Sequence, residues 1–391
     1  MVDYDPFSAE IIHGDPYPTY RRLQDEAPVF RIERYGCFAL SRFADVWEAC
    51  SHPAYSAAQG TTAGHLLTRI QPVAPMLNVM DPPHHTRLRA QLRGFFSPRR
   101  MRALEPEIRR FVGELLDTLV EKGEFDVVRD FAQPLSTFVA AKVSGFPFED
   151  GAEMRDRIEL VFSREEGTDA VTDSGIRAMQ EIFEYFTRFS AERRKRPSKT
   201  EDVLATLHAF EIDGRSLADD EVASHLSLFL IGGTDTLPKA FANAIVRLYD
   251  HPDQRARVAV EPALALDAFN EALRIDAPTQ YMCRLLLEDV EIRGETMPAD
   301  SPVLLLYAAA NRDTREFGDA DVFRLDRRPP RFLGFSHGTH GCIGMHVART
   351  EARIGIEEIL ARNPEYAVFR DRAEPYQNEF VKGLAKLPMR L

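Results

Sequence analysis

The chain has 391 residues, 44% of them hydrophobic, and a formal net charge of −12. This composition is ample for a large core, and the acidic balance argues against a nucleic-acid partner. No apolar run is long enough to cross a bilayer, and the N-terminus lacks the basic and apolar regions of a signal peptide. We therefore expect a cytoplasmic protein without membrane contact. Because no linker or repeat divides the sequence, we expect a single domain over residues 1–391.

Apolar residues recur with helical periodicity along most of the chain. Ser216 and Asp219 have the spacing of a capping box at the start of a long helix. The expected fold is mainly α (α+β), with a small β part segregated to one side. The predicted helices cover residues 101–121, 151–165, 174–195, 216–250, 254–276 and 345–361, and strand-like patterns cover 29–41, 284–294 and 380–391.

A basic stretch runs from His84 to Leu104 and contains six arginines but no acidic residue. His85 and Arg89 are four residues apart, so on a helix they share one face and could reach the carboxylates of a bound cofactor. The remaining arginines would face outward, toward an acidic partner. The alternative is an ordinary solvated helix face.

The segment IGGTDTLPKA, residues 231–240, interrupts the long predicted helix. Its two glycines weaken the helix, and Pro238 cannot donate to the carbonyl of Thr234. Beside this interruption stand Asp235 and Thr236, an acid next to a hydroxyl. They are either incidental polar residues at a kink or a proton donor beside a pocket for a small polar guest.

The segment FSHGTHGCIGMHVARTE, residues 335–351, concentrates three histidines, one cysteine and three glycines. These residues could bind zinc. Zinc motifs, however, typically supply their ligands as two close pairs separated by a loop, and the sequence has no second pair. A second interpretation is a haem with one axial thiolate, Cys342, at the N-terminus of the helix that follows. Gly338, Gly341 and Gly344 would let the backbone pass close to a flat ring. A glycine-rich turn with solvent-facing histidines is the third.

Taken together, these segments resemble the bacterial cytochrome P-450 family from end to end. FSHGTHGCIGMHVAR resembles the haem loop of the family, and IGGTDT resembles its oxygen-binding helix motif. NEALR, residues 270–274, resembles the family's Glu-x-x-Arg motif, and DPPHHTRLR, residues 81–89, resembles the segment before the helix that binds the haem propionates. The order and spacing of the four motifs also agree.

The resemblance implies roles for individual residues. Cys342 is the axial ligand of the iron of haem b (iron protoporphyrin IX), and Phe335 packs beneath the haem beside the sulfur. Asp235 and Thr236 are the catalytic acid–alcohol pair that delivers protons. The other residues implied to contact the haem are His85, Arg89, Arg284, His340 and Gly344, and those of a structural charge cluster behind the haem loop are Glu271, Arg274 and Arg327.

Three positions depart from the family pattern. Ser336 replaces the first glycine of the haem loop, so a slightly different turn is expected there. Arg324 stands where the family often has aspartate. Pro238, just after the oxygen-binding motif, is uncommon, and we interpret it as reinforcing the groove.

The implied activity is that of a haem-thiolate monooxygenase, which inserts one oxygen atom from O2 into a hydrophobic small molecule. No flavin or iron–sulfur motif is present, so electrons from NAD(P)H would arrive through a ferredoxin and its ferredoxin reductase. The acidic face of that ferredoxin would meet Arg93, Arg99 and Arg100. The alternatives are a haem-dependent peroxygenase, an oxidative coupling enzyme and a non-catalytic haem sensor.

Overall fold

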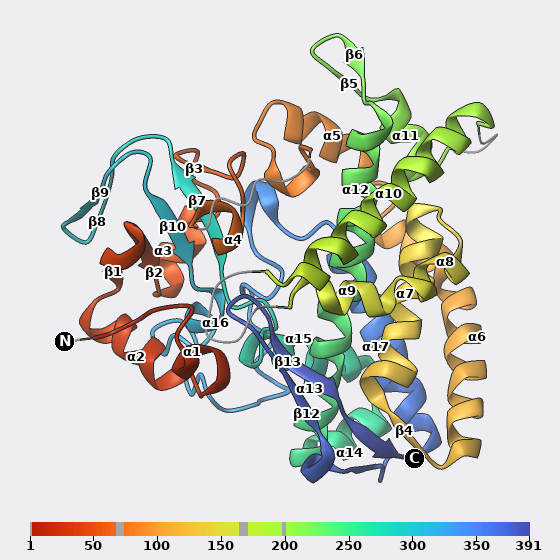
Figure 1. Cartoon of the computed structure of the whole chain (residues 1–391). Helices are drawn as coiled ribbons and strands as arrows, with labels where there is room; N and C mark the ends of the chain where they lie inside the picture. The colour runs from red at the N-terminus through yellow and green to blue at the C-terminus, as the bar shows by residue number, and fades with distance from the viewer. Residues whose placement is uncertain (1, 68–73, 164–170, 198–200) are drawn as a thin grey trace.

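The structure is a computed structural model that describes residues 2–67, 74–163, 171–197 and 201–391. Helices fill one half of the molecule and a small sheet with its short helices forms the other half (Figure 1). The N-terminus lies in the sheet half, and the C-terminus lies among the helices. This arrangement confirms the expected mainly α fold with a segregated β part.

The helices vary from short turns to long rods. In chain order they are α1 (Ala9–His13), α2 (Tyr17–Glu26), α3 (Phe43–Ala49), α4 (Ala63–Leu66), α5 (His84–Leu92), α6 (Pro98–Lys122), α7 (Gln133–Ser144), α8 (Phe148–Glu153), α9 (Arg155–Val161), α10 (Asp173–Lys195), α11 (Val203–Ala209), α12 (Asp219–Thr234), α13 (Thr236–Asp250), α14 (Pro252–Val260), α15 (Ala265–Ile275), α16 (Tyr307–Ala310) and α17 (Met345–Arg362).

The largest sheet has five strands in the order β1-β2-β10-β7-β3, in which β10 runs parallel to β2 and the other neighbours are antiparallel. Its strands are β1 (Val29–Ile32), β2 (Cys37–Leu40), β3 (Tyr55–Ser56), β7 (Met282–Leu286) and β10 (Pro302–Leu305). A second sheet has the order β11-β14-β4, with β4 (Glu124–Asp126), β11 (Ala367–Val368) and β14 (Pro388–Arg390). The hairpins are β5 (Glu211–Ile212) with β6 (Arg215–Ser216), β8 (Val290–Ile292) with β9 (Glu295–Met297), and β12 (Glu374–Gln377) with β13 (Lys382–Lys386).

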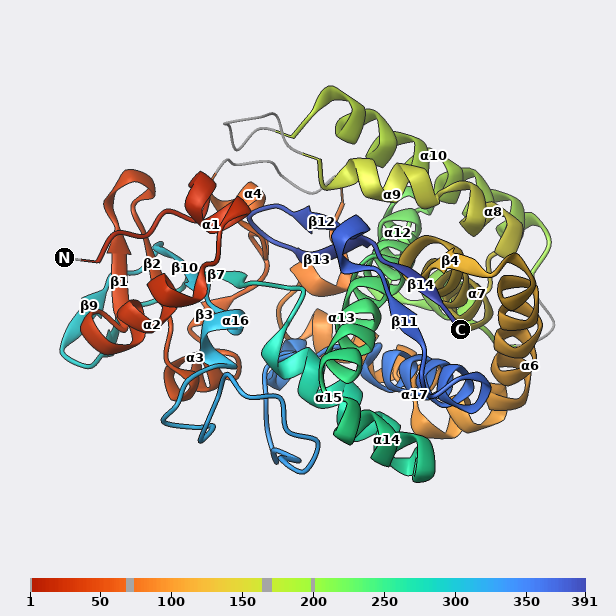
Figure 2. The same ribbon diagram turned by 90° about the horizontal axis from the view of Figure 1, so that it is seen from below.

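Helix α12 runs through the centre of the helical half. Its apolar residues lie on all sides, and it packs against α7 and α10, which is typical of a helix enclosed by protein. Figure 2 shows the β12–β13 hairpin lying over α13, between the two halves. Strand β13 is in contact with α13. This contact between α13 and β13 therefore brings the middle and the end of the chain together.

Most predicted elements agree with the structure, and the differences have local causes. The predicted helix 216–250 is broken after Thr234, as the glycines and Pro238 indicated. The predicted helix 254–276 is divided by a 3-10 turn at Pro262–Leu264, because proline has no N–H for the helix ladder. The predicted helix 151–165 is two short helices, α8 and α9, and its last two residues lie outside the described residues.

The predicted capping box at Ser216 is wrong. Ser216 belongs to β6, where it pairs with Glu211, so its backbone is extended rather than at a helix start. The helix begins at Asp219, and the carboxylate of Glu221 accepts a hydrogen bond from the Ala218 N–H at 2.8 Å. The capping interaction therefore forms two residues later, with a glutamate as the acceptor.

Across the residues that the structure describes, no helix is both long enough and apolar enough to cross a membrane.

His225 connects the centre of α12 to the chain that precedes α5. Its Nδ1 accepts a hydrogen bond from the Leu77 N–H at 3.2 Å, and the side chain is 1% exposed. Burial lowers the pKa of His225 to about 4, while Glu221 opposes the shift. The folded state therefore favours the neutral ring, which is also the form that can accept this bond.

This pKa predicts a loss of stability in acid. As pH falls below about 6.5, the unfolded chain takes up a proton at His225 before the folded chain does, so the free energy of unfolding falls until about pH 4, by up to about 3 kcal/mol. His225→Gln keeps an acceptor for Leu77 but cannot titrate. Denaturant unfolding of the variant should therefore lose less free energy than wild type between these pH values. Equal losses would contradict the assignment.

Candidate haem site

Four basic side chains that are distant in the sequence meet beside the haem loop, residues 335–344. His85 lies on α5, is 1% exposed, and neither of its ring nitrogens has a hydrogen-bond partner within the described residues. Its ring centroid is 4.3 Å from that of His340. Arg89, one turn further along α5, donates from Nη2 to the Gly341 carbonyl at 2.5 Å. Arg284, on β7, is 3% exposed and donates to the Cys283 carbonyl.

The electrostatics of these four groups favour an anionic guest. Burial, with nearby Arg89 and Arg284, lowers the pKa of His85 to about 4 and that of His340 to about 3, so both rings are neutral at pH 7. Arginine stays charged in proteins. No ion pair joins either arginine to a carboxylate in the described part of the chain. Charges that are removed from water need a partner, and the two propionates of a haem would supply both negative charge and an acceptor for the single N–H of neutral His85.

Cys342 lies just before the N-terminus of α17, as the sequence predicted. Its N–H donates to the Phe335 carbonyl at 2.8 Å, and α17 begins at Met345. Burial raises the pKa of the thiol, and the Gly344 N–H, Arg89 and Arg349 oppose this by favouring the thiolate.

Cys342 also differs from the other three cysteines in its accessibility. Cys37, Cys50 and Cys283 are buried, whereas Cys342 is exposed. Cys342 is therefore accessible to solvent, and protein atoms around it still raise the pKa of its thiol. A thiol in that position can bind a metal centre that approaches from one side.

The first half of the haem loop has an unusual backbone. Ser336 has φ +58° and Gly338 has φ +67°, both in the left-handed region. A Cβ at Gly338 would lie 2.4 Å from the Cys50 carbonyl oxygen, so only glycine allows the loop to approach this closely. Phe335 is half-buried, and the guanidinium of Arg349 lies 5.0 Å from its ring centroid.

The zinc interpretation has no support in the structure. His337 stacks on Trp47 with ring centroids 3.6 Å apart. Across the described ranges, no group of three or more His, Cys, Asp or Glu side chains is arranged to hold a metal ion. The haem loop therefore offers a single thiolate, not a set of metal ligands.

Asp235 and Thr236 lie at the break between α12 and α13 but face different surroundings. Asp235 is 5% exposed, and its Oδ1 is 2.5 Å from Nζ of Lys239, one turn further on. Thr236 is half-buried, and its hydroxyl has only a long contact, 3.5 Å, to the Gly232 carbonyl. The acid is therefore held in an ion pair, whereas the alcohol is available to another partner.

Lys239 is a site residue that the sequence reasoning missed. It is 5% exposed, and its Nζ also lies 3.9 Å from the ring centroid of Tyr376 on β12. A Cβ at Gly383 would lie 2.7 Å from Lys239 Cβ, so this glycine lets β13 cover the lysine. The four-residue spacing of Asp235 and Lys239 could have indicated the pair, but not its burial under a hairpin from the C-terminal end.

The predicted charge cluster forms as expected. Glu271 and Arg274 on α15 make two hydrogen bonds, at 2.8 and 2.9 Å, and both side chains are buried. Arg327 donates from Nε to the same carboxylate at 2.8 Å. The backbone N–H of Arg324 donates to it as well, at 3.2 Å, so the residue that departs from the family pattern contributes through its main chain.

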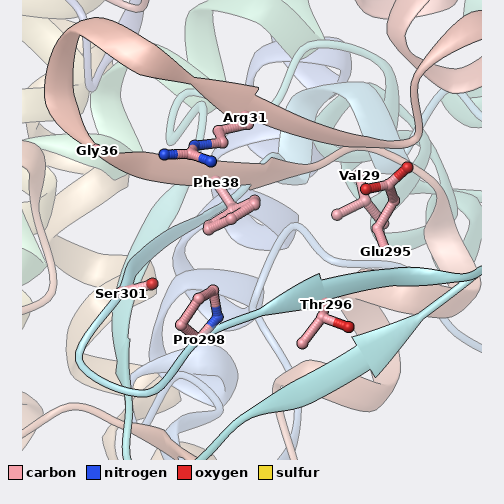
Figure 3. A pocket seen from close by; sticks show the side chains of 8 residues that line it. All are labelled: Val29, Arg31, Gly36, Phe38, Glu295, Thr296, Pro298 and Ser301. Atoms are coloured by element: carbon pink, nitrogen blue, oxygen red, sulfur yellow. The ribbon is translucent and has the colours of Figure 1, made fainter.

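A separate surface hollow of about 390 Å³ lies in the sheet half, between the β1–β2 hairpin and the β8–β9 hairpin (Figure 3). Its walls mix apolar and polar side chains, and it includes none of the residues predicted for the site. The lining residues are Val29, Arg31, Gly36, Phe38, Glu295, Thr296, Pro298 and Ser301.

Comparison with known proteins identifies the family of the chain. The family model described as Cytochrome P450 matches residues 171–363. Cytochrome P450 130 of Mycobacterium tuberculosis is 34% identical over 393 residues, covering 96% of this chain and 95% of that protein. Vitamin D(3) 25-hydroxylase of Pseudonocardia autotrophica is 33% identical over 383 residues, covering 96% and 93%. The crystal structure of CYP109E1 from Bacillus megaterium in complex with corticosterone has a TM-score of 0.82 at 28% identity, covering 96% of this chain and 98% of that chain.

These relatives align with almost the whole chain, and the solved structure has the same fold. The chain therefore belongs to the cytochrome P450 family of bacteria and is a cytochrome P450 monooxygenase.

Proposed function

We propose that this monooxygenase holds haem b through Cys342 and hydroxylates a hydrophobic small molecule with one oxygen atom of O2. Electrons come from NAD(P)H through a ferredoxin reductase and a ferredoxin, in the cytoplasm. The observation that carries the proposal is one accessible thiol at the head of α17 beside four basic side chains, two buried and two half-buried. None of the four has a carboxylate partner among the described residues: His85, Arg89, Arg284 and His340.

When bound, a haem with a thiolate ligand supplies the activation of O2 and its cleavage. The residues of the chain bind and orient it. The two arginines and the two neutral histidines would hold its carboxylates, with His85 donating from one ring nitrogen. Phe335 would pack beside the sulfur, and Gly344 would support the thiolate through its N–H.

The acid–alcohol pair would hold and move protons. The hydroxyl of Thr236 is weakly bound and can donate to an oxygen atom in the pocket. Asp235 has one carboxylate oxygen on Lys239, and its other oxygen, Oδ2, has no hydrogen-bond partner among the described residues. That free oxygen is the acceptor through which protons would pass.

The proposed substrate is an apolar molecule of terpenoid, steroid or aromatic size. Two relatives support this class, one a vitamin D(3) hydroxylase and one crystallised with corticosterone. Their substrate and ligand share a large apolar body, which suits a pocket that orients its guest by shape and a few polar groups.

The proposed docking site for the ferredoxin is the junction of α5 and α6. Arg93, Arg99 and Arg100 are exposed there, and no ion pair holds them in the part of the chain that the structure describes. Helix α5 carries Arg89 inward to the haem loop and is followed at once by Arg93, so the docking face and the cofactor would be separated by one helix.

Replacing the proposed ligand tests the haem assignment. Cys342→Ser should abolish the long-wavelength Soret band of the reduced carbon-monoxide complex, because that band requires a thiolate opposite the bound gas. The measurement is the difference spectrum of the purified variant. As controls, His337→Ala and His346→Ala should keep the iron content of wild type. A variant that retained the band without Cys342 would refute the assignment.

Replacing Thr236 tests the reaction class. In Thr236→Ala, O2 and NAD(P)H consumption should continue, while product per electron pair falls and hydrogen peroxide rises. Loss of a hydrogen bond to a developing charge costs about 3 kcal/mol, roughly a hundredfold in rate. The assay measures product, peroxide and O2 with surrogate redox partners.

Two variants sharpen that experiment. Thr234→Ala is the matched control, because the Thr234 hydroxyl already donates to the Leu230 carbonyl at 2.7 Å within α12. The product formed per electron pair in this variant should equal that of wild type. Asp235→Asn should slow O2 consumption itself. Wild-type coupling in Thr236→Ala would rule out the acid–alcohol mechanism. A peroxygenase would form product only with added peroxide, and a sensor would form none.

Charge reversal tests the docking site. Arg93→Glu with Arg99→Glu should slow reduction by ferredoxin by about tenfold or more at low salt and flatten its salt dependence, because steering by charge is lost. Stopped-flow reduction measures both effects, and substrate binding should not change. Arg177→Glu with Arg188→Glu, two exposed arginines on α10, is the control. Equal slowing in both double variants would place docking elsewhere.

A further inference from the structure

The first half of the haem loop rests on the end of α3 and on α16. Gly338 touches the Cys50 carbonyl, and His337 stacks on Trp47 of α3. The N–H of Leu333, just before the loop, donates to Oδ1 of Asn311 at 2.7 Å. This half of the loop is therefore held by the sheet half of the molecule, whereas Cys342 continues into α17.

Ser336 joins this contact through its side chain. Its hydroxyl oxygen lies 2.7 Å from that of Tyr307, and the Tyr307 hydroxyl lies 3.5 Å from Sγ of Cys50. Tyr307 is 2% exposed and Cys50 is 6% exposed. Three polar groups from α16, the end of α3 and the haem loop thus form one chain of hydrogen bonds, buried at Tyr307 and Cys50 and half-buried at Ser336.

Ser336 adopts a backbone conformation that is unfavourable for any residue with a Cβ. Its φ of +58° is the left-handed conformation that glycine adopts readily. A serine here is therefore strained, and its hydroxyl bond to a buried tyrosine offsets that strain.

The peptide unit between Phe335 and Ser336 is bonded at both ends. The Ser336 N–H donates to the Leu333 carbonyl at 3.1 Å, and the Phe335 carbonyl accepts the Cys342 N–H at 2.8 Å. Because φ of Ser336 sets the orientation of this peptide, fixing the Ser336 side chain also fixes the carbonyl that holds the Cys342 backbone.

We propose that Ser336 and Tyr307 form a clamp that positions Cys342. The hydroxyl pair holds the Phe335–Ser336 peptide in the orientation that binds the Cys342 N–H, and so holds the sulfur in place for its ligand. The clamp spans the two halves of the molecule. This inference rests on the proposed role of Cys342 as the haem thiolate, and it assigns positioning, not catalysis, to Ser336 and Tyr307.

The test follows the thiolate state of the haem-loaded protein. In mild denaturant, the long-wavelength Soret band of the reduced carbon-monoxide complex should be lost about threefold to tenfold faster in Tyr307→Phe and in Ser336→Ala, the loss expected for one hydrogen bond. The double variant should be no faster than either single variant, because both remove the same bond. Far-UV circular dichroism, recorded in parallel, shows that the protein is still folded while the band is lost.

Ser336→Gly separates clamping from strain. Glycine removes the strain and the hydroxyl together. If the hydroxyl acts as a clamp, the variant should lose the Soret band faster than wild type. If Ser336 only adds backbone strain, the variant should lose the band more slowly. Tyr366→Phe is the matched control, because Tyr366 is equally buried and its hydroxyl donates to the Ile245 carbonyl at 2.8 Å, outside the haem loop. Its band should persist as long as in wild type while the protein stays folded.

The outcomes separate the two proposals. A wild-type protein without the long-wavelength band would defeat the proposed role of Cys342 itself. If wild type has the band, then band loss in Ser336→Gly at or below the wild-type rate would overturn the clamp. Equal acceleration in Tyr307→Phe and Tyr366→Phe would overturn it as well. Should Tyr307→Phe fail to fold, the rates of band loss in Ser336→Ala and Ser336→Gly still decide whether the clamp exists.

Discussion

The buried carboxylate of Glu271 is the constraint on which the haem loop depends. It accepts hydrogen bonds from the side chains of Arg274 and Arg327 and from the backbone of Arg324. Arg274 in turn donates to the carbonyls of Asn311 and Ala320, at 2.8 Å each. Burying an ion pair costs desolvation free energy and contributes little net stability. Its value here is specificity, because only one course of the segment 311–327 satisfies all of these donors and acceptors.

That segment delivers the chain to the haem loop. Asn311, whose carbonyl binds Arg274, also accepts the Leu333 N–H through its side chain, so the cluster and the loop share one residue. At the other end, Arg89 binds the Gly341 carbonyl and α17 begins at Met345. The thiol of Cys342 is thus placed between two fixed ends, and its position does not depend on its own packing.

Local motifs were predictable from the sequence because their geometry depends on near neighbours. The helix break after Thr234, the helix after Cys342 and the Glu271–Arg274 pair each involve residues within about one turn, and the structure contains all three. The four-residue spacing of His85 and Arg89 predicted that these two share a helix face. Their clustering with Arg284 and His340 was implied only by family resemblance, since these segments are distant in the sequence.

What could not be predicted are contacts between distant segments. The burial of Lys239 beneath β13 joins residues 239 and 383, and the bond of Ser336 to Tyr307 joins the loop to α16. The haem-loop pattern identified Ser336 as a departure from the family, but it did not identify Tyr307 as the partner of Ser336. The misplaced capping box has a local origin instead, because Ser216 pairs with Glu211 in a short hairpin that the helical periodicity did not reveal.

Bringing the basic residues of the site together costs folding free energy, and a bound cofactor would offset that cost. Arg284 is buried and Arg89 is half-buried, and both stay charged without a carboxylate partner in the described residues, where both nitrogens of His85 also lack hydrogen bonds. Each uncompensated group destabilises the folded chain relative to the unfolded chain, where water would solvate it. A ligand that binds only the folded state adds its own free energy of binding to stability. The proposed haem would therefore complete the fold as well as the catalytic site, since its carboxylates would supply the negative charge and the acceptor that groups on α5 and β7 lack within the described residues.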